Sequence, residues 1–111
     1  MTGCPLTPRE RAVLDAPLSV EPDGAAELRA QARHAVVSET CDCGCPSVDF
    51  AHPADTRGMR VRVNAAVNGS DDGLFLYTVG PWLGGIEYVG VSAQDPDVFP
   101  EPDLLTITPV Y

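Results

Sequence analysis

The feature that most constrains the fold is a change of hydrophobic period near His34. Before this residue, apolar side chains recur at spacings of three and four, which is typical of helices. After it, apolar and polar residues alternate, which is typical of strands with one buried face. Helices followed by strands in one short chain predict an α+β fold, with the helices packed on an antiparallel sheet.

The first helix is predicted from its capping residues. The hydroxyl of Thr7 can cap free backbone N–H groups, Pro8 suits the first helical position, and Glu10 can complete a capping box. We expect this helix to end before Pro17, because the residue that precedes a proline is disfavoured in helical geometry.

The second helix is expected to start at Asp23 and to end near His34, so that both helices lie within about residues 7–33. Its apolar residues share one face at spacings of three and four: Ala25, Leu28 and Ala32. Because this face is mostly alanine, we expect the helix to lie close against whatever it covers.

The sheet is predicted within about residues 34–92. Runs of apolar and β-branched residues predict the strands: 35–40, 48–50, 59–67, 74–79 and 86–91. In the third run, one face should hold Val61, Val63, Ala65 and Val67. Turn signals at 68–73 and 80–85 give short connections, which imply antiparallel neighbours. We therefore predict a four- to five-stranded antiparallel β-meander with the two N-terminal helices packed across one face.

The C-terminal segment, 93–111, is acidic and rich in proline. We expect it to be extended, and a short edge strand at Leu104–Thr108 is an option. An unpaired edge can join a second copy of the chain, so the oligomeric state is open and an edge-strand dimer is one option. A chain of 111 residues has the usual size of one domain, and we assign 1–111 to a single domain.

The charge balance limits the classes of partner. Sixteen acidic residues stand against seven arginines, which gives a formal net charge of −9. A field of this sign repels phosphate backbones and anionic lipid, so we expect no nucleic acid and no membrane partner, whereas a basic protein partner would be attracted. No run approaches the ~18 apolar residues of a membrane helix, and the N-terminus lacks the pattern of a secretory signal. We expect a cytoplasmic protein.

The cysteines carry the most distinctive chemistry. Three of the four lie close together in the sequence: Cys41, Cys43 and Cys45. Thiolates bind zinc in a tetrahedral site, and the candidates for a fourth ligand are Cys4, His34 and His52. A Cys-x-Cys pair can also form a strained, reactive disulfide, and three thiols can simply fill a tight hairpin as small apolar side chains. These uses stay open, although a cytoplasmic setting argues against a structural disulfide.

Trp82 is the second candidate, because it stands in a turn rich in glycine and proline. It is either an exposed anchor for a binding partner or a side chain folded back to cover the sheet. The serines lack a nucleophile elbow, and the glycines around Trp82 lack the pattern of a phosphate loop. The sequence therefore favours a role other than catalysis.

The segment Cys41-Asp-Cys-Gly-Cys-Pro-Ser-Val-Asp-Phe50 resembles the cysteine segment of short, uncharacterised actinobacterial proteins. In that group, as here, a helix with Leu-Arg-Ala-Gln (28–31) precedes the cysteines, and a pattern matched by Leu83-Gly-Gly-Ile-Glu-Tyr-Val89 follows. The resemblance covers roughly residues 7–91. It implies the same order of elements and a bacterial cytoplasmic setting, and it brings no catalytic residues.

Two function hypotheses follow. The first is a non-enzymatic interaction or regulatory module, in which the sheet face or the Trp82 turn contacts a protein partner. The alternative is a metal-binding (zinc) or thiol-redox protein that uses Cys41, Cys43 and Cys45. The first requires less of the sequence and is the leading prediction.

Overall fold

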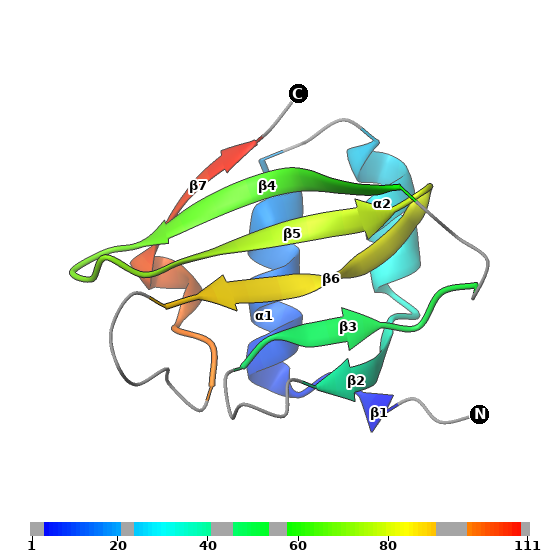
Figure 1. Cartoon of the computed structure of the whole chain (residues 1–111), viewed down its shortest axis with the longest axis horizontal. Helices are drawn as coiled ribbons and strands as arrows, with labels where there is room; N and C mark the ends of the chain where they lie inside the picture. The colour runs from blue at the N-terminus through cyan, green and yellow to red at the C-terminus, as the bar shows by residue number, and fades with distance from the viewer. Residues whose placement is uncertain (1–3, 21–23, 41–45, 54–57, 91–97, 110–111) are drawn as a thin grey trace.

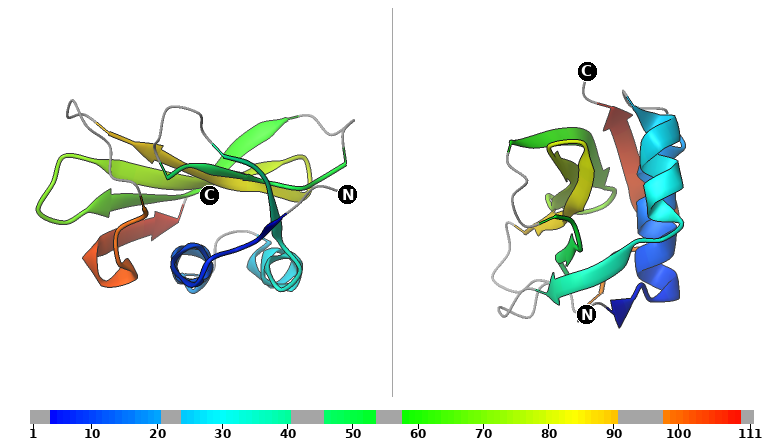
Figure 2. Two further views of the ribbon diagram at one scale, coloured as in Figure 1. Left: turned by 90° about the horizontal axis from the view of Figure 1, so that it is seen from below. Right: turned by 90° about the vertical axis from the view of Figure 1, so that its right-hand side faces the viewer.

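The computed structural model of the chain describes residues 4–20, 24–40, 46–53, 58–90 and 98–109. Within these ranges, two helices lie against an antiparallel sheet (Figure 1). Seen along the sheet, both helices lie on the same side of it (Figure 2). The predicted α+β class is confirmed.

Helix α1 (Pro8–Leu18) begins with the predicted capping box. Thr7 Oγ1 accepts the Glu10 N–H at 3.1 Å, and Glu10 Oε1 accepts the Thr7 N–H at 2.8 Å. The predicted end before Pro17 is wrong, because the helix continues through it. So close to the C-terminus, proline removes a single helical hydrogen bond. The burial of four residues on one face outweighs that loss: Val13, Leu14, Pro17 and Leu18.

Helix α2 (Ala25–Ala32) follows Gly24, whose φ of 75° lies in the left-handed region that favours glycine. Its buried residues are the predicted ones: Ala25, Leu28 and Ala32. The predicted start at Asp23 lies outside the described residues.

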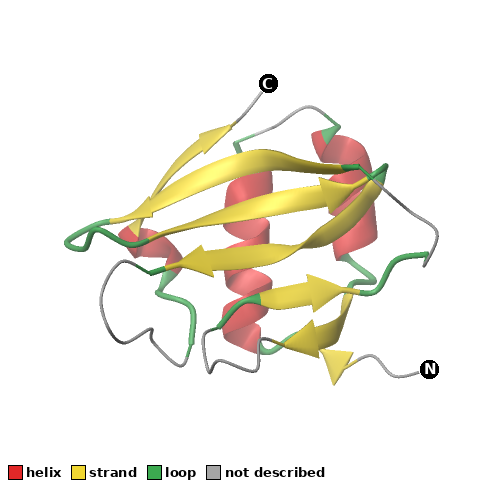
Figure 3. Ribbon diagram, in the orientation of Figure 1, coloured by secondary structure: helices red, strands yellow, loops and turns green. Residues whose placement is uncertain are grey.

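The described strands form one sheet in the order β1-β2-β3-β6-β5-β4-β7, with all neighbours antiparallel (Figure 3). Their bounds are β1 (Cys4–Pro5), β2 (Val36–Thr40), β3 (Val48–Phe50), β4 (Met59–Val67), β5 (Gly73–Val79), β6 (Trp82–Val89) and β7 (Leu105–Pro109). The predicted four to five strands are too few, because the two-residue β1 adds one edge strand and β7, close to the position considered for an edge strand, adds the other.

The strand order also corrects the predicted meander. The short turns do place β4, β5 and β6 side by side, but β3 pairs with β6 and not with β4. The segment 51–58, which joins β3 to β4, explains this difference. At ~3.3 Å per residue it is long enough to pass two strands spaced ~4.8 Å apart.

A β-bulge in β4 changes which valines reach the core. Val61 lies opposite Tyr77, whereas Val63 lies opposite Leu76, with the register shift between them. Since adjacent residues of β5 point to opposite faces, Val61 and Val63 do so too, which corrects the single face predicted for both. The remaining members of the predicted face are buried: Val63, Ala65 and Val67.

The C-terminal segment is bound to the rest of the fold at several points. Phe99 is only 1% exposed and belongs to the core, and its carbonyl accepts a hydrogen bond from Arg9 Nη1 at 2.8 Å. A short 3₁₀ turn, η1 (Pro102–Leu104), then leads into β7, which pairs with β4 close to the predicted position. Among the described residues, no helix is long and apolar enough to cross a membrane.

Candidate functional site

The three clustered cysteines, Cys41, Cys43 and Cys45, lie outside the described residues. The backbone of Cys4 belongs to β1 and pairs with Val37 of β2. Within the described ranges, no three His, Cys, Asp or Glu residues are grouped to hold a metal ion. The zinc site therefore stays a prediction.

The two histidines lie at one end of the β2–β3 pair. His34 precedes β2, and His52 follows β3, where its Nδ1–H donates to the Pro53 carbonyl at 3.1 Å. The opposite end of this pair is formed by Thr40 and Val48, which flank the connection that carries the three cysteines. The five residues of β2, at ~3.3 Å each, separate the histidines from the start of that connection.

Trp82, the first residue of β6, forms part of a pocket of about 410 Å³. The indole side chain is 40% exposed, so it is neither fully buried nor free of the protein surface. The pocket is lined by residues from both helix and sheet: Ala30, Gln31, His34, Ala35, Phe50, Ala51, Trp82 and Leu83. The structure thus brings together Trp82 and His34, which the sequence analysis treated separately. We call this site the Trp82 pocket.

Gln31 of α2 fixes the backbone on both sides of Trp82. Its Nε2 donates to the Pro81 carbonyl at 2.8 Å, and its Oε1 accepts the Leu83 N–H at 2.8 Å. The side-chain amide therefore pairs with the start of β6 much as a neighbouring strand would. Sequence reasoning did not find Gln31, because nothing local marks a glutamine whose partners lie some fifty residues away.

The chemistry of the Trp82 pocket is mainly apolar. Phe50 of β3 is among the lining residues, and three alanines from α2 and from positions next to β2 and β3 line much of the rest. The polar side chains are those of Gln31 and His34, and the amide of Gln31 already bonds to the backbone. The pocket is therefore suited to an apolar group with a polar atom near its edge.

A second cluster lies on the sheet face away from the helices. The half-buried Tyr77 lies across two glycines of β6, and its hydroxyl donates to Asp49 Oδ1. A Cβ atom added at Gly84 would stand 2.6 Å from Tyr77 Cε2, so the ring occupies the space of a side chain. Phe75 extends the cluster, with its ring centroid 6.0 Å from that of Tyr77. Glycine is required here by close packing.

Burial raises the pKa of Tyr77, and the hydrogen bond to Asp49 and the negative charges of Asp49 and Glu87 raise it further. The phenol therefore stays protonated and acts as a donor, not as a base or nucleophile. A pKa raised in the folded state adds stability that is complete below the unfolded pKa, near ~10, and is lost as pH rises beyond it.

We therefore expect the protein to lose stability between about pH 9 and 11, and Tyr77→Phe to reduce that loss. Urea unfolding at a series of pH values measures it for both proteins. Because the two proteins share every other titratable group, the difference between the two curves isolates Tyr77. Parallel curves through pH 11 would contradict this assignment.

In comparisons with known proteins, no family model, curated protein or solved structure matches this chain. The functional assignment therefore depends on the geometry and chemistry of the described residues, and foremost on the Trp82 pocket.

Proposed function

We propose that this chain is a non-enzymatic interaction module of the bacterial cytoplasm, which binds a protein partner at the Trp82 pocket. The observation that carries the proposal is a tryptophan, 40% exposed, at the wall of a mainly apolar pocket of about 410 Å³. Tryptophan is among the residues that contribute most binding energy at protein interfaces, where it pairs with a partner side chain in a desolvated pocket.

The rigidity of the surroundings supports this role. Trp82 is a residue of β6, and the hydrogen bonds of Gln31 tie the backbone of Pro81 and Leu83, on either side of it, to α2. A binding surface that is already ordered loses little conformational entropy when a partner docks. The pocket can therefore convert the burial of an apolar side chain into affinity.

The charge of the chain suggests the character of the partner. A net charge of −9 attracts basic segments and accelerates their encounter with the surface. Together with the apolar pocket, this charge favours a segment in which a large apolar side chain is flanked by lysine or arginine. The apolar side chain would occupy the pocket beside Trp82.

The test uses the fact that Trp82 is the only tryptophan of the chain, so its fluorescence reports on the pocket directly. Peptides selected from a random displayed library on the wild-type protein should carry basic and apolar residues. Their binding should shift the Trp82 emission to shorter wavelengths. Replacing a central aromatic anchor typically costs at least ~2 kcal/mol, so Trp82→Ala should weaken the selected peptides about 30-fold.

Val89→Ala provides the matched control, because Val89 is a similarly exposed apolar residue at the other end of β6. It should change peptide affinity less than about twofold, as expected of a residue outside the contact. Peptides that bind Trp82→Ala as tightly as the wild type, or that leave the emission unchanged, would contradict the proposal.

The zinc-binding or thiol-redox alternative depends on Cys41, Cys43 and Cys45 and stays a prediction. The same holds for the resemblance to short actinobacterial proteins. The edge-strand dimer is also untested, although β7 does form an edge of the described sheet. A dimer through β7 would leave the Trp82 pocket free, because none of the residues that line the pocket belongs to that strand.

A further inference from the structure

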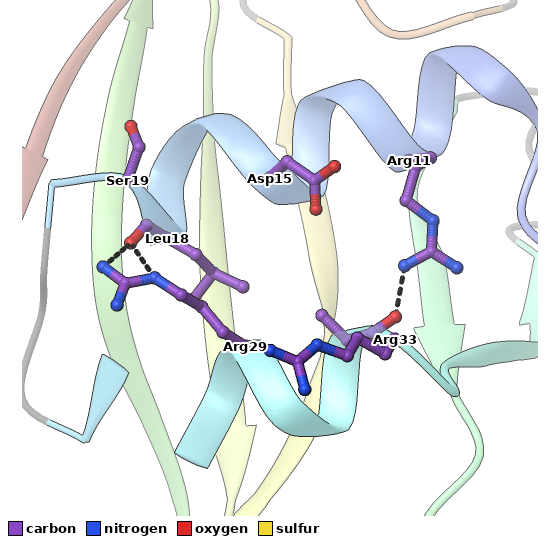
Figure 4. Close-up of a pocket in the computed structure, with 7 residues that line it drawn as sticks. Arg11, Asp15, Leu18, Ser19, Arg29 and Arg33 are labelled. Atoms are coloured by element: carbon purple, nitrogen blue, oxygen red, sulfur yellow. Dashed lines mark hydrogen bonds between the residues drawn. The ribbon is translucent and has the colours of Figure 1, made fainter. Parts of the chain in front are cut away.

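Three of the seven arginines of the chain line one groove between α1 and α2. The groove has a volume of about 620 Å³ and lies on the helix layer (Figure 4). Helix α1 and the residue that follows it contribute Arg11, Asp15, Leu18 and Ser19, and α2 and its C-cap contribute Arg29, Ala32 and Arg33. None of these residues lines the Trp82 pocket.

Two of the arginines are held in place by bonds that cross between the helices. Arg11 Nη1 donates to the carbonyl of Ala32, at the end of α2. Arg29 donates from Nε and Nη2 to the carbonyl of Leu18, at the end of α1, at 3.2 and 2.9 Å. Each guanidinium thus caps the last turn of the other helix, where carbonyl groups lack helical partners. These bonds fix both positive charges at the groove.

The other two charged residues are less constrained. Arg33, the exposed C-cap of α2, has no side-chain hydrogen bond or ion pair with any described residue. Asp15 is also exposed, and its carboxylate lies beyond 4 Å from every described arginine nitrogen. Among the described residues, the groove is therefore lined by three positive charges and one negative charge, in a chain whose net charge is −9.

We propose that this groove binds a small anion with clustered phosphate or carboxylate oxygens. The guanidinium group binds such oxygens through paired N–H donors, and the carbonyl contact of Arg11 uses only some of its five donors. A small ligand is favoured over an extended polyanion. The local positive charge acts within a Debye length of ~8 Å, whereas a long polyanion would also meet the negative remainder of the surface.

Asp15, the one acidic residue among the described residues that line the groove, refines the proposal. The carboxylate of Asp15 repels an anion placed against the middle of α1, so the ligand is drawn toward Arg33 on the α2 side. Neutralising Asp15 should therefore strengthen binding, whereas neutralising Arg33 should weaken it. Opposite effects from two exposed residues are difficult to produce by a change in folding.

The experiment titrates the full chain with inorganic pyrophosphate and, separately, with citrate at 0.15 M salt, and follows binding by calorimetry and by amide chemical shifts. Arg33→Gln should weaken binding about tenfold, the loss of one charge-assisted contact. Asp15→Asn should strengthen it several-fold. Arg60→Gln is the matched control: it removes the same charge from an exposed β4 residue outside the groove, and should change affinity less than twofold.

Binding of pyrophosphate alone would identify a phosphoryl ligand, and binding of citrate alone would identify a carboxylate ligand. Binding of both would identify a site that selects for charge. Each of these results supports the proposal if the variants respond as stated. Equal losses in Arg33→Gln and Arg60→Gln would show a general charge effect and overturn it, as would binding to neither probe. Trp82→Ala should bind both probes normally, so this test succeeds or fails independently of the peptide test.

Discussion

Replacing Gly85 with alanine is expected to lower the free energy of unfolding by about 3 kcal/mol. A Cβ atom at this position would lie 2.4 Å from the Val48 carbonyl oxygen and 2.6 Å from the Tyr77 hydroxyl. The carbonyl belongs to the backbone of β3, which can retreat only by separating from β6. In the described ranges, β3 and β6 are paired at two positions, Val48 with Ile86 and Asp49 with Gly85. This pairing links strands β1, β2 and β3 to the rest of the sheet. Urea unfolding followed by circular dichroism measures the loss.

Gly84→Ala is the informative comparison. The three atoms nearest to a Cβ atom there all belong to side chains, with Tyr77 at 2.6 Å and Val79 at 2.8 Å. Introducing each alanine into a Tyr77→Ala background completes a double-mutant cycle. The cost of Gly84→Ala should fall in that background, whereas most of the cost of Gly85→Ala should persist. If the Gly85→Ala cost disappeared with Tyr77, the backbone contact with β3 would not be its cause.

Leu14→Ala should be similarly damaging, with an expected loss of about 3 kcal/mol. Leu14 is fully buried on the face of α1 that packs into the core, and its truncation leaves a cavity between helix and sheet. Alanine is the better helix former, so any loss of stability reflects packing and not helix propensity. The same unfolding measurement provides the value.

Asp15→Ala is the control for Leu14→Ala, because Asp15 is the next residue of α1 and is exposed. It should change the free energy of unfolding by no more than about 0.5 kcal/mol. Equal losses in the two variants would contradict the assignment of Leu14 to the core.

Features with local causes were predictable from the sequence. The capping box between Thr7 and Glu10 involves residues three positions apart and forms as expected. The alternation predicted for 59–67 likewise appears in the second half of β4, where Val63, Ala65 and Val67 are buried. The end of α1 was missed, because core packing of Pro17 and Leu18 outweighs the local preference against proline.

The candidate site was predictable only in part. Trp82 was singled out because of the turn signal around it, but the structure places it at the start of β6, where it is 40% exposed. His34 was considered as a metal ligand, which stays a prediction, and the structure places it among the residues that line the Trp82 pocket. Gln31 and the arginine groove gave no sequence signal, because their contacts join residues far apart in the chain.

By itself, the sequence determined the α+β class, the start of α1, the buried face of α2 and the acidic charge. Each of these depends on composition or on residues within about one turn or one strand of each other. The tertiary structure alone decided the strand order, the bulge that separates Val61 from Val63, and the two sites. These features depend on which surfaces, far apart in the sequence, pack together. The pairing of β3 with β6, for example, is selected by the free energy of the whole core, and a local sequence pattern carries no information about that free energy.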